Sequence, residues 1–142
     1  MRRGGAIALL VGLLAGCQRA PAPDAAHMLP ADGGRSIEWQ GRRACADCAG
    51  IATRLVLEQG GGRQEYVLTE TYLSHGGEAR FAEHGRWRRL AMRLELQGDG
   101  GSRRAFALLP DGRLQPSDGH GAPLSMNDDA LLVPVAGTPP GP

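Results

Sequence analysis

The stretch "IATRLVLEQGGGRQEYVLTETYL", residues 51–73, holds two runs of alternating side chains joined by a glycine-rich break. In the first run, the apolar and β-branched side chains that share one face are Ile51, Thr53, Leu55 and Leu57. The second run, residues 65–73, is rich in the β-branched and aromatic residues that strands favour. A period of two predicts half-buried strands, and the glycines at 60–62 supply the backbone freedom that a tight turn requires. The stretch therefore predicts an antiparallel β-hairpin.

Runs of the same kind lie on both sides of this hairpin. The clearest is "LAMRLELQ", residues 90–97, where the face that we expect in the core carries Leu90, Met92, Leu94 and Leu96. The other candidate strands cover residues 37–43, 104–109 and 130–135, and glycine-rich breaks fall at 75–77, 98–102, 110–113 and 118–123. Short strands with such turns predict an all-β meander. Because closure removes exposed edges, we expect about six to eight antiparallel strands to close into a small β-barrel.

Only residues 35–136 show sustained hydrophobic periodicity. A segment of about 100 residues forms one domain with a modest core. The flanking segments, residues 17–34 and 137–142, are rich in proline, alanine and glycine. That composition predicts a disordered tether before the barrel and a disordered tail after it.

The N-terminus has the layout of a secretory signal peptide. Arg2 and Arg3 give a positive start, and an apolar stretch over residues 6–15 follows. This stretch is too short to cross a bilayer, which takes about 20 apolar residues. It ends in Leu-Ala-Gly-Cys at 14–17, which resembles the lipobox of bacterial lipoproteins. We therefore expect residues 1–16 to be removed and Cys17 to carry the lipid that anchors the chain in a membrane.

The sequence also limits where the chain resides and what it binds. Residue 18 is Gln rather than the Asp associated with inner-membrane retention, so we expect a lipid anchor in the bacterial outer membrane, facing the periplasm. The formal net charge of +1 does not provide the basic footprint that phosphate binding requires. We therefore expect the membrane, and no nucleic acid, as a partner.

Four features occur in order along the central part of the chain. They are a Cys-Ala-Asp-Cys-x-Gly-Ile-x-Thr core with Cys45, Asp47, Cys48, Gly50 and Thr53, a strand from Tyr66 to Tyr72, a Gly-x-Trp at Gly85 and Trp87, and a Leu-x-Leu at Leu94 and Leu96. Together they resemble the N-terminal domain of the NlpE lipoprotein family. The resemblance implies a small lipocalin-like β-barrel tethered by a lipidated cysteine. It also implies a role in envelope-stress sensing, an inner-membrane sensor kinase as partner and an association with copper.

Three roles are open to Cys45 and Cys48. In an oxidising periplasm, two cysteines this close predict a disulfide, with Asp47 hydrogen-bonded to backbone N–H groups of the turn. As two soft thiolates they also suit Cu(I). Further ligands would then come from the methionines and histidines, which are Met28, Met92, Met126, His27, His75, His84 and His120. A thioredoxin-like role is disfavoured because a strand follows the cysteines and no βαβ unit is present. We adopt the structural disulfide, with a copper site as the alternative.

The motifs of common enzyme classes are missing from the sequence. It contains no Gly-x-Ser-x-Gly, no His-Glu-x-x-His and no phosphate-binding glycine loop, so we expect no enzyme. We expect a non-enzymatic sensing or interaction module of the envelope stress response. The alternatives are a periplasmic Cu(I)-binding copper-resistance protein and a lipocalin-like carrier of a small apolar ligand. A carrier requires a cavity beneath the leucines Leu55, Leu57, Leu94 and Leu96.

Overall fold

The computed structural model describes residues 29, 35–124 and 130–135 of the chain. They form eight strands of one antiparallel sheet. In chain order the strands are β1 (Arg35–Arg43), β2 (Gly50–Gly60), β3 (Arg63–Ser74), β4 (Gly77–Leu90), β5 (Arg93–Gly98), β6 (Arg103–Leu108), β7 (Leu114–Ser117) and β8 (Val133–Val135). No helix in this described part of the chain has the length and apolar character needed to cross a membrane.

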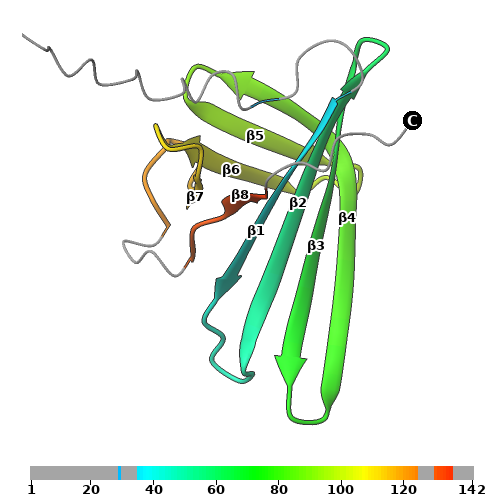
Figure 1. The fold of residues 1–142 in the computed structure, drawn as a ribbon, viewed down its shortest axis with the longest axis vertical. Helices are drawn as coiled ribbons and strands as arrows, with labels where there is room; N and C mark the ends of the chain where they lie inside the picture. The colour runs from blue at the N-terminus through cyan, green and yellow to red at the C-terminus, as the bar shows by residue number, and fades with distance from the viewer. Residues whose placement is uncertain (1–28, 30–34, 125–129, 136–142) are drawn as a thin grey trace, which may run out of the picture.

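The sheet is a meander rolled into a nearly closed barrel (Figure 1). Strands β1 to β7 pair in chain order, and β8 returns to pair with the other edge of β1. Leu132, just before β8, exchanges two backbone hydrogen bonds of 2.9 Å with Leu114, the first residue of β7. The indole N–H of Trp39 donates to the carbonyl of Gly112 in the β6–β7 turn at 2.9 Å. We call this junction, formed by Trp39, Gly112, Leu114 and Leu132, the seam.

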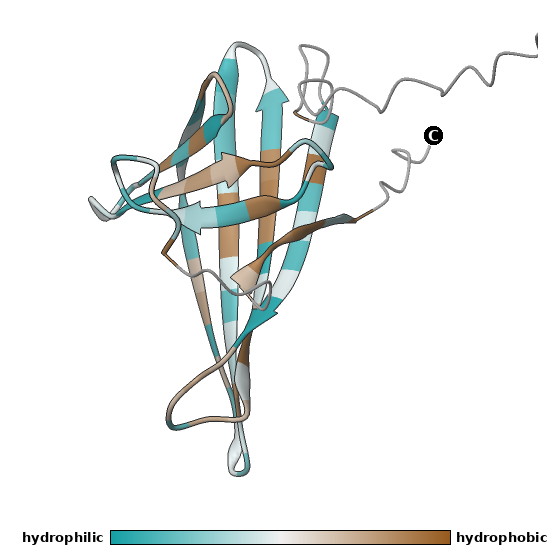
Figure 2. Ribbon diagram, turned by 90° about the vertical axis from the view of Figure 1, so that its left-hand side faces the viewer, coloured by the Kyte–Doolittle hydropathy of each residue, from teal (hydrophilic) through white to brown (hydrophobic). Residues whose placement is uncertain are grey.

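One hydrophobic core packs inside the barrel. Apolar bands recur along the strands in Figure 2, because alternate residues of each strand point inward. Burial of each large apolar side chain contributes about 1.5–3 kcal/mol. Leu29, which lies in the predicted tether, is also buried in this core. The strand residues of the core are Trp39, Leu55, Leu57, Tyr66, Leu68, Trp87, Leu94, Leu96, Phe106, Leu108 and Leu114, and Leu132 joins them from the segment before β8.

The predicted all-β antiparallel barrel is confirmed. The hairpin predicted from residues 51–73 is present, because β2 and β3 pair from Gly50 opposite Leu73 to Gly60 opposite Arg63. Its turn uses two glycines with positive φ at positions 61 and 62. The glycine-rich breaks at 75–77, 98–102 and 110–113 also fall where one strand gives way to the next.

The predicted strand 90–97 is wrong at its N-terminal end. The chain turns at Ala91 and Met92, between β4 and β5, and Ala91 has a φ of 53°. Leu94 and Leu96 are buried as predicted, but the side chains of Leu90 and Met92 are 43% and 44% exposed. Met92 is therefore a turn residue and not a core residue. The turn lacks the glycine, asparagine or aspartate that signals a hairpin, so the alternation runs through it.

Two strands lie outside the predicted set. The first part of β4, residues 77–82, is exposed on both faces and carries no apolar alternation. Strand β7 has four residues and includes Pro116, which is unusual within a sheet. The predicted strand 130–135 is reduced to the three residues of β8.

Candidate functional site

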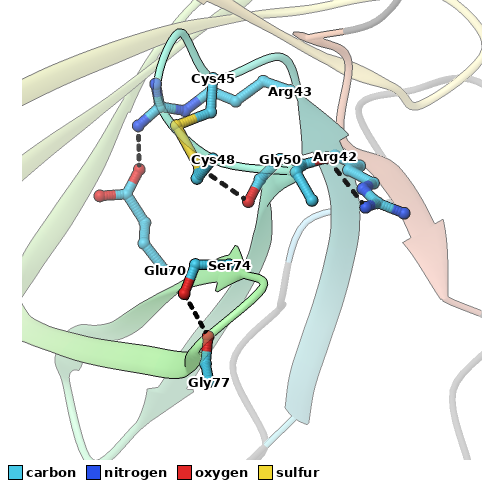
Figure 3. The surroundings of a disulfide bond; sticks show 9 residues. Arg42, Arg43, Cys45, Cys48, Gly50, Glu70, Ser74 and Gly77 are labelled. Atoms are coloured by element: carbon cyan, nitrogen blue, oxygen red, sulfur yellow. Dashed lines mark hydrogen bonds and ion pairs between the residues drawn. A yellow bond between two sulfur atoms is a disulfide. The ribbon is translucent and has the colours of Figure 1, made fainter.

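The loop between β1 and β2 contains a disulfide. Cys45 and Cys48 are joined, and their Cα atoms are 5.2 Å apart (Figure 3), within the usual range of about 4.4–6.8 Å. Both cysteines are half-buried, whereas Ala44, Ala46 and Asp47 are exposed. The predicted disulfide is therefore present, and in this state the pair offers no thiolate to a metal ion.

Hydrogen bonds on both sides fix this disulfide loop to the sheet. The N–H of Ala49 donates to the carbonyl of Leu73 at 2.7 Å. The guanidinium of Arg42 donates to the carbonyl of Ala49 at 3.2 Å. Gly50 then adopts a φ of 144°, which favours glycine because no Cβ is present. This conformation explains the glycine of the Cys-x-Gly core.

A chain of charged and polar side chains starts beside the loop and crosses the barrel interior. Arg43, the last residue of β1, forms an ion pair with Glu70 of β3, with Nη2 and Oε1 3.0 Å apart. The second oxygen of Glu70 lies 3.5 Å from Nη2 of Arg104 in β6. Nε of Arg104 lies 3.5 Å from Oε1 of Glu83 in β4. That same oxygen accepts a hydrogen bond from the Tyr66 hydroxyl at 2.6 Å. We call these five residues the interior network.

The interior network changes the ionisation of two of its members. Burial disfavours the charged carboxylate of Glu83, but the hydrogen bond from Tyr66, the nearby Ser102 hydroxyl and the charge of Arg104 together outweigh burial. The pKa of Glu83 therefore lies below its ordinary value of 4.5. Burial, followed by the hydrogen bond to Glu83, raises the pKa of Tyr66 well above its ordinary value of 10.0. At neutral pH, Glu83 is a carboxylate and Tyr66 is a hydrogen-bond donor.

A cavity of about 420 Å³ opens onto the interior network where β4 extends past β5. Leu68 lies among its lining residues, and Glu70, Glu83 and Arg104 supply polar groups. Phe81 also lines it and is 61% exposed. Five of its nine lining residues are polar or charged, so its wall is more polar than the mainly apolar wall of a usual ligand site.

A larger cavity of about 1380 Å³ shares Leu68, Glu70 and Arg104 with the smaller one. The carrier alternative requires a cavity beneath four leucines. Leu96 lines the larger cavity, whereas the other three, Leu55, Leu57 and Leu94, do not line it and are packed in the core. The available space is therefore more polar than a carrier of an apolar ligand requires, because charged side chains of the interior network form part of its wall.

The Gly-x-Trp motif packs β4 against its neighbours. Trp87 is buried, and its indole N–H donates to the carbonyl of Glu58 in β2 at 3.0 Å. Gly85 approaches β5 so closely that an added Cβ would collide with the carbonyl of Gln97. The motif therefore has a packing role at this point of the barrel.

The two remaining motif residues lie near the loop. Thr53 of β2 is paired with Glu70 of β3 and lines the larger cavity. Asp47 is exposed, and its carboxylate makes no hydrogen bond to any residue that the structure describes. The turn-stabilising contacts predicted for Asp47 are thus absent within that part, because its side chain faces solvent.

The other candidate metal ligands are spread over the molecule. His75 lies in the β3–β4 turn, His84 on β4 and His120 in the loop after β7, and all three are exposed. Among the described residues, no three His, Cys, Asp or Glu side chains are grouped as a metal site would require. Several predictions fall outside those residues: the signal peptide 1–16, Cys17, the tail 137–142, and the candidate ligands His27, Met28 and Met126.

Sequence reasoning missed the interior network. Its members are distant in the chain, and charged residues in strands are usually solvated. One signal was available, because Glu70 falls on the same face of β3 as Tyr66 and Leu68, which are both buried. A carboxylate at an inward position requires a partner, but the alternation does not identify Arg43 or Arg104 as that partner.

Comparison with known proteins gives a consistent result. Residues 39–127 match the model of the NlpE N-terminal domain family. The chain is 37% identical over 87 residues to Lipoprotein NlpE of Escherichia coli K12, an alignment that covers 61% of this chain and 35% of that protein. It also resembles the crystal structure of the Cpx pathway activator NlpE from E. coli, with a TM-score of 0.56 and 35% identity.

The structural match covers 64% of this chain and 46% of the solved one. The chain thus spans about a third of the curated relative and about half of the solved one. The matched region contains the disulfide loop, the Gly-x-Trp motif and the whole interior network. The chain belongs to the NlpE N-terminal domain family.

Proposed function

We propose that this protein is a non-enzymatic lipoprotein module that senses envelope stress or passes it on through contact with a partner. The observation that carries the proposal is the match to the E. coli Cpx pathway activator, at 35% identity over a shared fold. The region that matches the family model includes the cysteine core and the Gly-x-Trp motif, which shape the loop and the barrel wall.

The exposed end of the barrel supports a role in contacts. The disulfide loop and the β3–β4 turn lie at the same end of the molecule, where Gly50 pairs with Leu73 (Figures 1 and 3). Most residues of this end are exposed, while Arg43 and Glu70 tie it to the interior network. A rigid, exposed loop is well suited to present a surface to another protein.

The proposal includes a partner and a location, which rest on the resemblance to the family and on the lipobox-like segment before Cys17. An inner-membrane sensor kinase would read the module, and a lipid on Cys17 would hold it in the outer membrane, facing the periplasm. A short lipid tether restricts the reach of the barrel. Signalling would then increase when the protein fails to leave the inner membrane.

A reporter assay tests this function. The full chain is expressed in E. coli that lacks its own NlpE and carries a reporter of the Cpx pathway. We expect the reporter to rise, and to rise further with Gln18→Asp, which favours inner-membrane retention. Deleting the pathway's sensor kinase should abolish both responses. A chain that is present in the membrane fraction but leaves the reporter at its basal level would disprove the proposal.

A second candidate function, the carriage of a small amphiphile, is favoured by the larger cavity. Its volume of about 1380 Å³ exceeds the range of about 300–1,000 Å³ typical of ligand sites. Apolar Leu96 and Phe106 and charged Glu70 and Arg104 all line it, so the ligand would carry both a chain and a polar group.

Mass spectrometry of organic extracts tests the carrier role. The protein purified from the envelope should release a stoichiometric amphiphile, and Phe106→Glu should release less because it places a charge on the apolar wall. An extract without any such molecule, together with no binding of a fluorescent fatty acid, would reject a carrier role and leave the sensor proposal intact.

A further inference from the structure

The first part of β4 is an open sheet edge. Strand β4 pairs with β3 along residues 77–86, but β5 joins it only from Gly85 onward. No other described strand pairs with residues 77–83, and this part of β4 extends past the end of β5 in Figure 1, with β3 on its other side. Such an edge presents unpaired backbone groups that another strand can bind.

One hydrogen bond shows which groups face outward from this edge. The carbonyl of His84 accepts a bond from the N–H of Asp99 at 2.9 Å, on the β5 side of β4. In a strand, backbone groups of alternate residues point to the same side. The N–H and C=O groups of Glu78, Arg80 and Ala82 therefore face the open edge, where they meet no described strand.

We propose that this edge is a self-association surface, on which a second copy of the chain adds its own β4 in antiparallel register about Ala79. In this register Glu78 of each copy lies opposite Arg80 of the other. Direct cross-strand neighbours have Cβ atoms about 4.5–5.5 Å apart, so two symmetric ion pairs form. Because the outward-facing groups of Glu78 and Arg80 meet each other, the two copies exchange ladder hydrogen bonds.

The neighbouring registers fit less well. Pairing about Arg80 places Arg80 of one copy opposite Arg80 of the other, and the two positive charges repel each other. Pairing about Phe81 places Glu78 opposite His84, whose carbonyl is already occupied by Asp99. Only the register about Ala79 combines opposite charges with free backbone groups on both copies.

The inner face of the hairpin supports the same register. There, Phe81 lies opposite Gly77 of the second copy, and nothing lies within 4 Å of the position of a Cβ on Gly77. The ring of Phe81 is 61% exposed and meets Tyr72 edge to face, with centroids 5.5 Å apart. In the pair it covers the empty space over the glycine, an arrangement that stabilises glycine in strands.

Charged side chains on an edge often prevent association, which is the alternative explanation for Glu78 and Arg80. The two interpretations predict different effects of charge reversal on association. Charges that only protect the edge would leave the protein monomeric, and their reversal would change nothing. Charges that pair across a two-fold axis make association sensitive to each reversal and restore it when both are exchanged.

Cysteine cross-linking tests the proposal on the full chain in the E. coli envelope. Ala79→Cys lies on the two-fold axis, where opposite Cα atoms are about 4.5 Å apart, within disulfide range. We expect a cross-linked dimer on non-reducing gels. Ala82→Cys, on the same exposed edge, lies opposite Gly76 and should cross-link much less.

The charge variants then identify the register. In the Ala79→Cys background, Glu78→Arg or Arg80→Glu should each reduce the cross-linked fraction about tenfold, because each opposes like charges at two places. The double exchange should restore it, and so should coexpression of the two single variants. Equal cross-linking of Ala79→Cys and Ala82→Cys, no dimer, or no effect of charge reversal would overturn the proposal. Since all these residues are exposed, thermal melts should confirm unchanged folding.

Discussion

Arg43 and Glu70 form an ion pair of 3.0 Å that joins the strand before the disulfide loop to the interior of the barrel. The disulfide loop therefore begins at a residue that is already held by the interior network. The Glu70 side chain is 13% exposed and the Arg43 side chain 43% exposed, so the pair spans the boundary between core and solvent. Changes in the loop are thereby coupled to the polar wall of the cavities.

Reduction of the disulfide should destabilise the barrel modestly. The loop that it closes is short, so the loss expected from the chain-entropy model is about 1–2 kcal/mol. Urea unfolding with and without reductant measures this loss in the free energy of unfolding. The variant with both Cys45→Ser and Cys48→Ser should match the reduced protein and ignore the reductant. A loss of more than about 4 kcal/mol would mean that the loop organises far more of the fold than its contacts indicate.

Copper binding should depend on the redox state of the same pair. We expect no tight Cu(I) binding by the oxidised protein, because both sulfur atoms are bonded to each other. After reduction, the two soft, half-buried thiolates, three residues apart, are expected to take up one Cu(I) ion. Titration against a Cu(I) chelator, before and after reduction, measures this difference. Equal binding in both states, retained after Cys45→Ser, would place the metal elsewhere.

Gly85→Ala should destabilise the barrel by about 2 kcal/mol or more. The added Cβ would meet the Gln97 carbonyl and the Gly98 Cα, and these backbone atoms cannot move aside as a flexible side chain can. Gly100→Ala is the matched control, since a Cβ there meets nothing within 4 Å. Thermal and urea unfolding of the two variants should separate them clearly, and equal stabilities would show that β4 and β5 can spread apart.

The interior network should contribute to the loss of stability in acid. The pKa of Glu83 is lower in the folded state than its ordinary value of 4.5, so its contribution is present above that value. The contribution is lost as the pH falls through the lower, folded-state pKa, because the unfolded chain then binds the proton first.

Glu83→Gln should therefore lower the free energy of unfolding at pH 7. It should also make that free energy fall less steeply as the pH is lowered into the acid range. Urea unfolding at a series of pH values checks this expectation. Glu65→Gln serves as the control, because Glu65 is exposed and lies outside the network. If the free energy of unfolding of the Glu83 variant and of the parent protein fell equally with acid pH, other carboxylates would govern acid unfolding.

Trp39→Phe should weaken the seam selectively. The phenyl ring still fills most of the space that the indole occupied. The hydrogen bond to Gly112 is lost, at a cost of about 1 kcal/mol or somewhat more. Hydrogen exchange should accelerate at the Leu114 and Leu132 amides, which bond to each other across the seam. Trp87→Phe is the comparison, because it removes a similar bond elsewhere in the sheet. Equal acceleration at the seam in both variants would indicate a global effect.

The sequence predicts the barrel best where a strand has one buried and one exposed face. β2 and β3 meet this condition, and their glycine turn has a clear signal. The turn at Ala91 and Met92 has no such signal, so local alternation predicted one strand where the chain forms a hairpin. The start of β4 has no buried face, and only its backbone bonds to β3 make it a strand.

The candidate site was predictable in part for the same reason. The close spacing of Cys45 and Cys48 is a local property, and it predicted the disulfide that the structure contains. The interior network depends on which strands face each other across the barrel. Glu70 and Arg104 meet only because β3 and β6 lie on opposite parts of one closed wall. That closure is set by the whole sheet, which a pattern within one strand does not specify.

The seam and the short strand β8 beside it give the barrel an uneven resistance to mechanical force. Strand β8 holds to β1 through only three paired residues, whereas β2 and β3 share eleven. A pull on the chain beyond Val135 would load the β8 hydrogen bonds first and then the pair of bonds between Leu114 and Leu132. The barrel would open between β1 and β7, while the long pairing of β2 with β3 stays intact. Tension on this end of the chain would thus expose the core before it unfolds the domain.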